Sequence, residues 1–180
     1  MYDGAAHSIA EIEGMKDYTV IINSFSKAFA MCGWRIGYAA GPAHIVTAMT
    51  RCQENFNACA SSIGQAAAAA ALERMEESEK LCQVFAKRRA VLVDGLSKIE
   101  GIGCGNPEGA FYVFADISSF GLNSVEFCER LLAEQHVVCI PGSAFGACGE
   151  GFIRMAYTCS DEALQKAIDR IAVFCQGLRK

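Results

Sequence analysis

The chain lacks several features that mark special classes of protein. No apolar run reaches the ~18–20 residues that a membrane-spanning helix needs, so the sequence predicts no membrane protein. Basic residues are not in excess, because 16 lysines and arginines stand against 20 acidic residues and leave a net charge of −4. This balance argues against a general nucleic-acid-binding or anionic-membrane surface. No G-x-G-x-x-G motif is completed, which disfavours a dinucleotide site.

Closely spaced cysteine pairs are also missing, although the chain contains 10 cysteines. No C-x-x-C or C-x4-C pair occurs, and His7, His44 and His136 are isolated, so we expect no metal site. Cys128 and Cys139 lie in apolar segments, which is typical of reduced thiols that act as small hydrophobic side chains. With no signal peptide at the N-terminus, we expect a protein of the reducing cytoplasm.

The remaining composition is that of an ordinary globular protein. Apolar residues make up 52% and charged residues 20%, which excludes wholesale disorder. Strand-like segments alternate with segments of helical periodicity, so we expect an α/β fold. Residues 18–23 are apolar and rich in β-branched side chains, which predicts a buried parallel strand. The other expected strands are 35–40, 110–117, 137–140 and 152–158, and the expected helices are 42–57, 61–71, 73–99, 124–135 and 161–178.

The densest group of chemically active side chains follows the first expected strand. Lys27 is flanked by Ser24 and Ser26, a placement that solubility alone does not explain. A lysine amine is nucleophilic when unprotonated, a state that burial or a nearby cation favours, and it then forms Schiff bases with aldehydes. Arg35 would supply that cation, and together with Ser24 and Ser26 it would form a cradle for a phosphate. An aldehyde-binding lysine beside a phosphate cradle describes a site for pyridoxal phosphate.

This segment also resembles that of a known family. Residues 24–37 read S-F-S-K-x-x-A-M-x-G-x-R-I-G, which is similar to the pyridoxal-phosphate attachment segment of the class I and II aminotransferases, enzymes of fold type I that include aspartate aminotransferase. The resemblance implies that Lys27 is the Schiff-base lysine and that Ser24, Ser26 and Arg35 hold the cofactor phosphate. It further implies that Lys27 moves the proton between the cofactor and the substrate Cα.

Two later segments carry the same resemblance. Residues 106–112, N-P-E-G-A-F-Y, are similar to the P-x-G-A-F-Y segment of the family's small domain. Residues 141–146 and 151–156 resemble the block P-G-x-x-F-G followed by G-x-x-R, in which the arginine binds the substrate α-carboxylate. The resemblance therefore implies this role for Arg154. A planar guanidinium on a rigid strand would bind a carboxylate in a bidentate manner that lysine could not reproduce.

The resemblance also implies how the chain is organised. Residues 1–75 would be the end of the large cofactor-binding domain and its sheet, residues 76–99 a bridging helix, and residues 100–180 a small α/β domain. Family members are roughly twice as long, so we expect this chain to be the C-terminal half, with the other part preceding Met1. We expect the intact enzyme to be a homodimer that uses pyridoxal phosphate to transfer an amino group between an amino acid and a 2-oxo acid.

Other interpretations remain open at this point. The same fold could serve another reaction at the α-carbon, such as that of a C–S lyase or a synthase. The chain could also be a non-catalytic fragment that acts as a dimerisation module. Ser24-x-x-Lys27 matches the S-x-x-K of serine acyl-enzymes, but the K-T-G that such a site needs is absent from the sequence. Arg154 could be an ordinary ion-pair partner in a strand.

Overall fold

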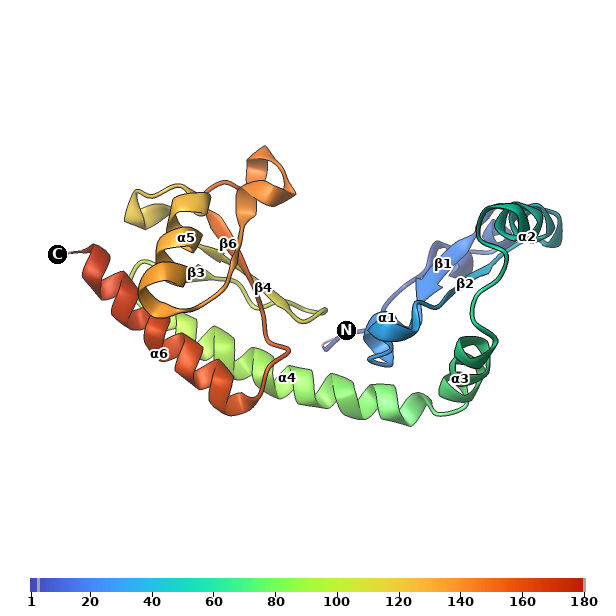
Figure 1. Cartoon of the computed structure of the whole chain (residues 1–180), viewed down its shortest axis with the longest axis horizontal. Coiled ribbons are helices and arrows are strands. Elements are labelled where there is room, and N and C mark those ends of the chain that lie inside the picture. The colour runs from blue at the N-terminus through green and yellow to red at the C-terminus, as the bar shows by residue number, and fades with distance from the viewer. Residues whose placement is uncertain (3, 180) are drawn as a thin grey trace. The chain divides into compact units, whose positions relative to one another are not determined.

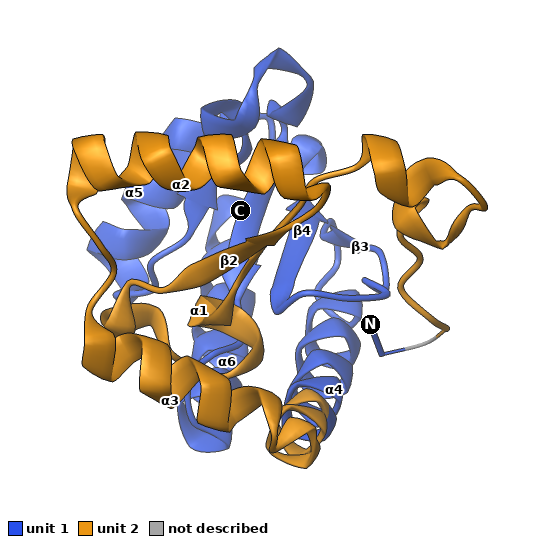
Figure 2. Cartoon of the chain, turned by 90° about the vertical axis from the view of Figure 1, so that its right-hand side faces the viewer, with its two compact units in different colours: residues 1–3, 83–180 blue, residues 4–82 orange. Residues whose placement is uncertain are grey.

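The computed structural model describes residues 1–2 and 4–179. These residues form two compact units, shown in different colours in Figure 2. The N-terminal unit comprises residues 4–82, and the C-terminal unit comprises residues 83–180 together with residues 1–3. The longest helix, α4 (Met75–Ser97), contains the boundary between the units (Figure 1).

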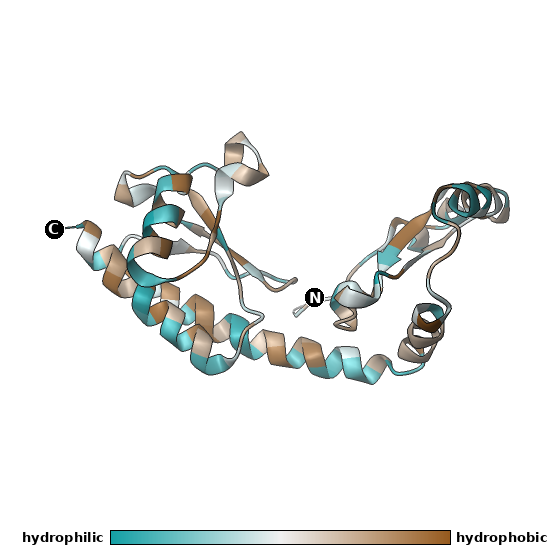
Figure 3. Ribbon diagram, viewed as in Figure 1, coloured by the Kyte–Doolittle hydropathy of each residue, from teal (hydrophilic) through white to brown (hydrophobic). Residues whose placement is uncertain are grey.

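The N-terminal unit is built around a two-stranded antiparallel ladder. Strand β1 (Ile21–Ser24) pairs with β2 (Gly37–Ala40), in a register that places Ile21 opposite Ala40 and Ser24 opposite Gly37. Within the described residues, the strand expected at 18–23 is therefore paired antiparallel, with β2, and is not buried. A parallel pair needs a crossover connection, usually a full helix, whereas only a four-residue helix and one 3₁₀ turn join these strands. Ile22 is 76% exposed, and Figure 3 shows the hydrophobic start and the polar end of β1.

Helices complete the N-terminal unit. The two 3₁₀ turns Ile9–Glu11 and Met15–Tyr18 precede β1, and α2 (Ala43–Asn57) follows β2 with Pro42 as its N-cap. Helix α3 (Ser62–Leu72) begins at Ser61, whose Oγ accepts a hydrogen bond from the Gly64 amide at 3.4 Å. The small core of this unit combines α3 with the β1–β2 connection. Its buried members are Phe25, Met31, Ile36 and Ala68.

The C-terminal unit contains a four-stranded antiparallel sheet in the order β3-β4-β6-β5. Its strands are β3 (Gly103–Cys104), β4 (Tyr112–Asp116), β5 (Ile140–Pro141) and β6 (Phe152–Ala156). The helices are α5 (Ser124–Gln135), α6 (Asp161–Leu178) and the second part of α4, with 3₁₀ turns at Ser118–Phe120, Gly142–Phe145 and Ala147–Gly149. The expected strand at 137–140 is thus confined to Ile140–Pro141.

One continuous core holds the C-terminal unit together. Leu92 and Leu96 of α4, Phe127 and Leu131 of α5 and Ile171 of α6 are almost completely buried. Helices α4 and α6 approach closely at Gly95, where an added Cβ atom would lie only 2.7 Å from Cδ1 of Ile168. Ser160 caps α6, its Oγ accepting from the Ala163 amide at 3.2 Å.

The core makes a direct prediction for stability. Phe127 is 0% exposed and its ring lies 5.1 Å from that of Phe174, so Phe127→Ala should lower the free energy of unfolding by about 3–5 kcal/mol. Leu132 on the same helix is 47% exposed, and Leu132→Ala should cost less than about 1 kcal/mol. Urea unfolding of the two variants measures both values. Equal losses would show that α5 does not bury the Phe127 face.

The cysteines fall into different environments. All ten are free thiols, but only Cys128, Cys139 and Cys175 are buried, while Cys32, Cys52, Cys59, Cys148 and Cys159 are exposed. The interpretation as small hydrophobic side chains therefore holds for the three buried residues and not for the exposed ones. Within the described ranges, no helix is long and apolar enough to cross a membrane, and no group of three metal-ligating side chains occurs.

The buried thiols predict a loss of stability at high pH. Burial, with a smaller contribution from Cys128, raises the pKa of Cys139 to about 12, and burial raises the pKa of Cys128 to about 11. Because the unfolded chain loses these protons near pH 9, their contribution is complete below that pH and is lost as the pH rises toward 12. Urea unfolding of wild type and Cys139→Ala between pH 8 and pH 11 tests this. A decline of equal size in both proteins would contradict it.

Candidate functional site

The connection between β1 and β2 brings the predicted cofactor residues together. Ser24 ends β1 and caps the short helix α1 (Phe25–Ala28), its Oγ accepting from the Ser26 amide at 3.1 Å. The Phe25 amide donates to the Ile36 carbonyl at 3.3 Å, so the chain returns beside the start of α1. Arg35 precedes that contact by one residue. The backbone therefore places Ser24, Ser26 and Arg35 at the same end of the β1–β2 ladder.

Gly37 makes this close return possible. A Cβ atom at this position would lie 2.6 Å from the carbonyl oxygen of Asn23, which is closer than real side chains approach a backbone. The final glycine of the 24–37 motif is thus explained by the pairing of the strands rather than by a ligand.

Arg35 is held in an unusual backbone conformation. Its φ is +52°, in the left-handed region that residues other than glycine seldom adopt. One guanidinium nitrogen donates to the Cys32 carbonyl at 2.8 Å, which ties the side chain to the 3₁₀ turn Cys32–Trp34. A residue in this conformation persists only where the surrounding structure holds it in place.

Lys27 lies in the third position of α1, and its side chain is exposed. The helix is anchored beside it by Phe25, which is 3% exposed and whose ring lies 5.5 Å from that of Phe29. Burial at this helix is thus confined to Phe25, and Lys27 itself is exposed. Lys27 therefore belongs to the same four-residue helix as Ser26, and Ser24 is the N-cap of that helix.

The charge around this site suits an anion. Residues 18–53 contain Lys27, Arg35 and Arg51 but no aspartate or glutamate, in a chain whose net charge is −4. The Ser24 hydroxyl uses an oxygen lone pair toward Ser26 and keeps its hydrogen for donation, and Arg35 uses one of its N–H groups toward Cys32. Hydroxyl and guanidinium donors beside a primary amine match a ligand that carries both a phosphate and an aldehyde. The residues present fit pyridoxal phosphate.

Arg154 lies in the C-terminal unit, in the middle of β6 between Phe114 of β4 and Ile140 of β5. Its guanidinium carbon lies 4.4 Å from the ring centroid of Tyr112 and 4.5 Å from that of Phe145. No acidic side chain in the described part of the chain pairs with it, so the interpretation as an ordinary ion-pair partner is not supported. Cation–π contacts with two aromatic rings thus help to hold the Arg154 guanidinium in place.

A hydrogen-bonded cluster fixes the loop that carries Phe145. Glu150 accepts from the Ser124 amide at 2.6 Å and from the Ser124 hydroxyl at 3.0 Å, and the Ser124 hydroxyl also contacts that of Ser143 at 3.0 Å. Hydrogen bonds from the amides of Ser124 and Gly151 hold the pKa of Glu150 below its usual range. The loop is thereby attached to the start of α5, which sets the position of the Phe145 ring.

The predicted residues thus form two groups. Ser24, Ser26, Lys27 and Arg35 are brought together in the N-terminal unit, and Arg154 lies in the C-terminal unit. Sequence reasoning missed Cys32, Tyr112 and Phe145, which contact the predicted arginines directly. Tyr112 and Phe145 are specified residues of the later motifs, so those motifs could have indicated both contacts. Cys32 occupies a variable position of its motif, which gave no such indication.

Comparisons with known proteins agree with these features. The family model for aminotransferase class I and II matches residues 1–171. Aromatic-amino-acid aminotransferase 2 of Thermococcus litoralis is 41% identical over 95% of this chain and 45% of its own length. An aspartate aminotransferase of Rhizobium meliloti is 40% identical over 92% of this chain and 42% of its own. The chain thus spans about half the length of the curated relatives that it matches.

Solved structures give the same result. The aromatic aminotransferase from Pyrococcus horikoshii OT3 superimposes with a TM-score of 0.92 and 38% identity, covering 99% of this chain and 48% of that one. The aspartate aminotransferase from Rhizobium meliloti gives a TM-score of 0.89, covering 97% of this chain and 46% of that one. The expected fold class, α/β of fold type I, is confirmed. This chain belongs to the class I and II aminotransferase family.

Proposed function

We propose that this chain supplies the cofactor lysine, the phosphate ligands and the substrate-carboxylate arginine of a pyridoxal-phosphate-dependent aminotransferase. The observation that carries the proposal is the donor set at the end of the β1–β2 ladder, where Ser24, Ser26 and Arg35 flank Lys27 in an acid-free segment. The similarity to relatives named as aspartate and aromatic-amino-acid aminotransferases supports the class of reaction. The substrates would be an α-amino acid and a 2-oxo acid.

Each residue would have a distinct task. The hydroxyls of Ser24 and Ser26 and the guanidinium of Arg35 would donate to the phosphate and fix one end of the cofactor. The Lys27 amine would hold the aldehyde end until the substrate amine replaces it there, and the freed Lys27 amine would then move a proton from the substrate Cα to the cofactor. When bound, pyridoxal phosphate supplies an electron sink for the negative charge left at that carbon.

Arg154 would orient the substrate. Two of its N–H groups would donate in parallel to the two carboxylate oxygens, and the contacts with Tyr112 and Phe145 would limit the movement of the guanidinium. Fixing the carboxylate limits the rotation of the Cα–H bond and so aligns the bond that must break.

We extend the proposal to organisation and location. Residues 1–75 would belong to a large cofactor-binding domain, residues 76–99 to a bridging helix and residues 100–180 to a small domain. A homodimer is supported by apolar side chains that α2 leaves open to solvent, of which Phe56 is 84% exposed. Ten free thiols without a disulfide among the described residues are compatible with the reducing cytoplasm.

Isotope transfer tests the reaction class. The holoenzyme is incubated with ¹⁵N-aspartate or ¹⁵N-phenylalanine and an unlabelled 2-oxo acid. Aminotransferase activity predicts that the label appears in the new amino acid with no release of ammonia. Release of ammonia without transfer of the label would instead indicate another reaction at the α-carbon and would overturn the proposal.

A further inference from the structure

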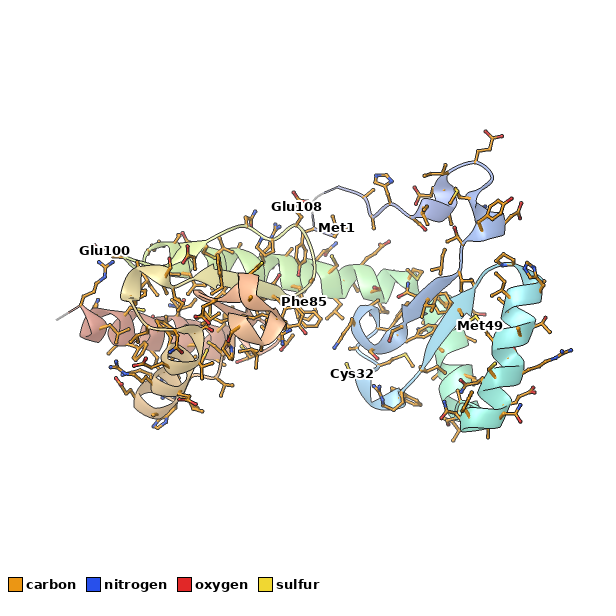
Figure 4. The ribbon with its side chains drawn as sticks, turned by 90° about the horizontal axis from the view of Figure 1, so that it is seen from above. Met1, Cys32, Met49, Phe85, Glu100 and Glu108 are labelled. Carbon is orange, nitrogen blue, oxygen red and sulfur yellow. The ribbon has the colours of Figure 1, made fainter. Side chains whose placement is uncertain are left out.

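Cys32 occupies a central position in the candidate site, although its motif leaves that residue variable. It begins the 3₁₀ turn Cys32–Trp34, five residues after Lys27 and three before Arg35, and Figure 4 labels it on the connection between β1 and β2. The thiol is exposed. Its importance lies in two contacts, one made by its side chain and one by its backbone.

The first contact completes the short helix α1. The Ala30 amide donates to the Lys27 carbonyl, and the Phe29 and Met31 amides donate to the Phe25 carbonyl. None of these three amides donates to the Ser26 carbonyl. The thiol of Cys32 donates to that carbonyl instead, with Sγ and O 2.9 Å apart. A side chain from the next turn therefore satisfies a helix-end carbonyl, as a capping group does.

The second contact runs to the arginine. The backbone carbonyl of Cys32 accepts from a guanidinium nitrogen of Arg35 at 2.8 Å. One residue thus binds the backbone of Ser26 on one side and the side chain of Arg35 on the other. Ser26 and Arg35 are both phosphate ligands in the proposed function, and Lys27 is attached to Ser26 by the next peptide bond.

We propose that Cys32 is a positioning residue for pyridoxal phosphate, setting the distance between the serine–lysine segment and Arg35. This inference rests on the proposed function. The thiol would not touch the cofactor. The thiol would keep the Ser26–Lys27 peptide in place. The Cys32 carbonyl would keep the Arg35 guanidinium directed toward the phosphate.

The test compares two aldehydes that differ only in the phosphate. Chains are exposed to pyridoxal phosphate or pyridoxal and reduced with borohydride, and the modified Lys27 peptide is quantified by mass spectrometry. We call the ratio of the two labelling yields the phosphate selectivity. Cys32→Ala should lower the phosphate selectivity about two- to threefold, the low end of the range for one lost hydrogen bond, because a thiol is a weak donor. Cys32→Ser keeps a donor and should recover part of the loss.

Matched controls separate positioning from folding. Cys59 is an exposed thiol between α2 and α3, and Cys59→Ala should leave the phosphate selectivity at the wild-type value. Thermal unfolding of each variant is recorded in parallel, since a purely structural role would lower the melting temperature without changing the selectivity. Equal selectivity in wild type, Cys32→Ala and Cys59→Ala would overturn the inference but leave the proposed function intact. Absence of phosphate-selective labelling at Lys27 in the wild type would overturn the proposed function itself.

A second measurement keeps the inference testable if Cys32→Ala does not fold. Folded wild type is treated with a reagent that converts thiols reversibly to methyl disulfides, and modification of Cys32 is verified by peptide mapping. The phosphate selectivity should fall and should recover after reduction with dithiothreitol, because the modified sulfur has no hydrogen to donate. Full selectivity with Cys32 modified would overturn the inference.

Discussion

Replacing Lys27 with alanine is expected to abolish the borohydride-stable attachment of pyridoxal phosphate to the β1–β2 connection. Lys27 is the lysine that α1 places beside Ser24, Ser26 and Arg35, and a bound phosphate would hold the aldehyde next to its amine. Because such proximity greatly raises the local concentration of the aldehyde, the yield of modified protein should fall by more than about tenfold. Mass spectrometry of the intact, reduced protein measures this yield.

Lys16→Ala is the matched control for this prediction. Lys16 is an exposed lysine of the same unit, but it lies in the 3₁₀ turn Met15–Tyr18, before β1. Its loss should leave the yield unchanged. If Lys27→Ala and Lys16→Ala retained equal yields, with the label spread over several lysines, Lys27 would not be the cofactor lysine.

Replacing Arg154 with alanine should weaken the binding of a 2-oxo acid by about a hundredfold or more. Each hydrogen bond to a charged group contributes about 1.5–3 kcal/mol, and the fork presents two N–H groups to the carboxylate. Arg154→Lys keeps the charge but loses the planar fork and its contacts with Tyr112 and Phe145, so it should recover only a small part of the affinity. Isothermal titration calorimetry of the three proteins measures the dissociation constants.

Two controls make the Arg154 result specific. Arg170 of α6 is a half-buried arginine of the same unit, and Arg170→Ala should leave the affinity unchanged. The amide of the same 2-oxo acid lacks the negative charge, so the wild type should bind it as weakly as Arg154→Ala binds the acid. Unchanged affinity in Arg154→Ala would show that Arg154 does not bind the substrate carboxylate.

Helices of the C-terminal unit could be predicted closely from the sequence, because their signals are local. Residues 161–178 show apolar side chains at helical spacing, with Ser160 as a cap and acidic residues in the first turn, and α6 has these bounds. The expected helix at 124–135 likewise coincides with α5. Caps and periodicity depend on neighbours in the sequence, so little else is needed to place such helices.

Strand pairing was harder to predict, since it depends on contacts that periodicity does not contain. The direction of β1 is set by the short connection through α1 and by the return of the chain at Gly37, whose backbone packs against Asn23. An apolar run of β-branched residues is compatible with either direction. Within this chain the strand pairs antiparallel with β2 and is exposed, a pairing that its apolar pattern did not predict.

The candidate site shows the same division between motif and geometry. Lys27, Ser24, Ser26, Arg35 and Arg154 could be proposed from residue types and motif spacing. The contacts that orient the two arginines could not, because the Cys32 carbonyl reaches Arg35 through a turn, and Phe145 reaches Arg154 from a loop fixed by Glu150 and Ser124. Such contacts become visible only once the backbone path is known.

The central claim is that the β1–β2 connection recognises the phosphate of an aldehyde that Lys27 captures. The most direct measurement is the phosphate selectivity of Lys27 labelling in wild type and in Arg35→Gln, with and without inorganic phosphate as a competitor. We predict a selectivity above about tenfold in the wild type, reduced by competing phosphate and by Arg35→Gln. Equal labelling of Lys27 by pyridoxal phosphate and pyridoxal, insensitive to both changes, would contradict the account.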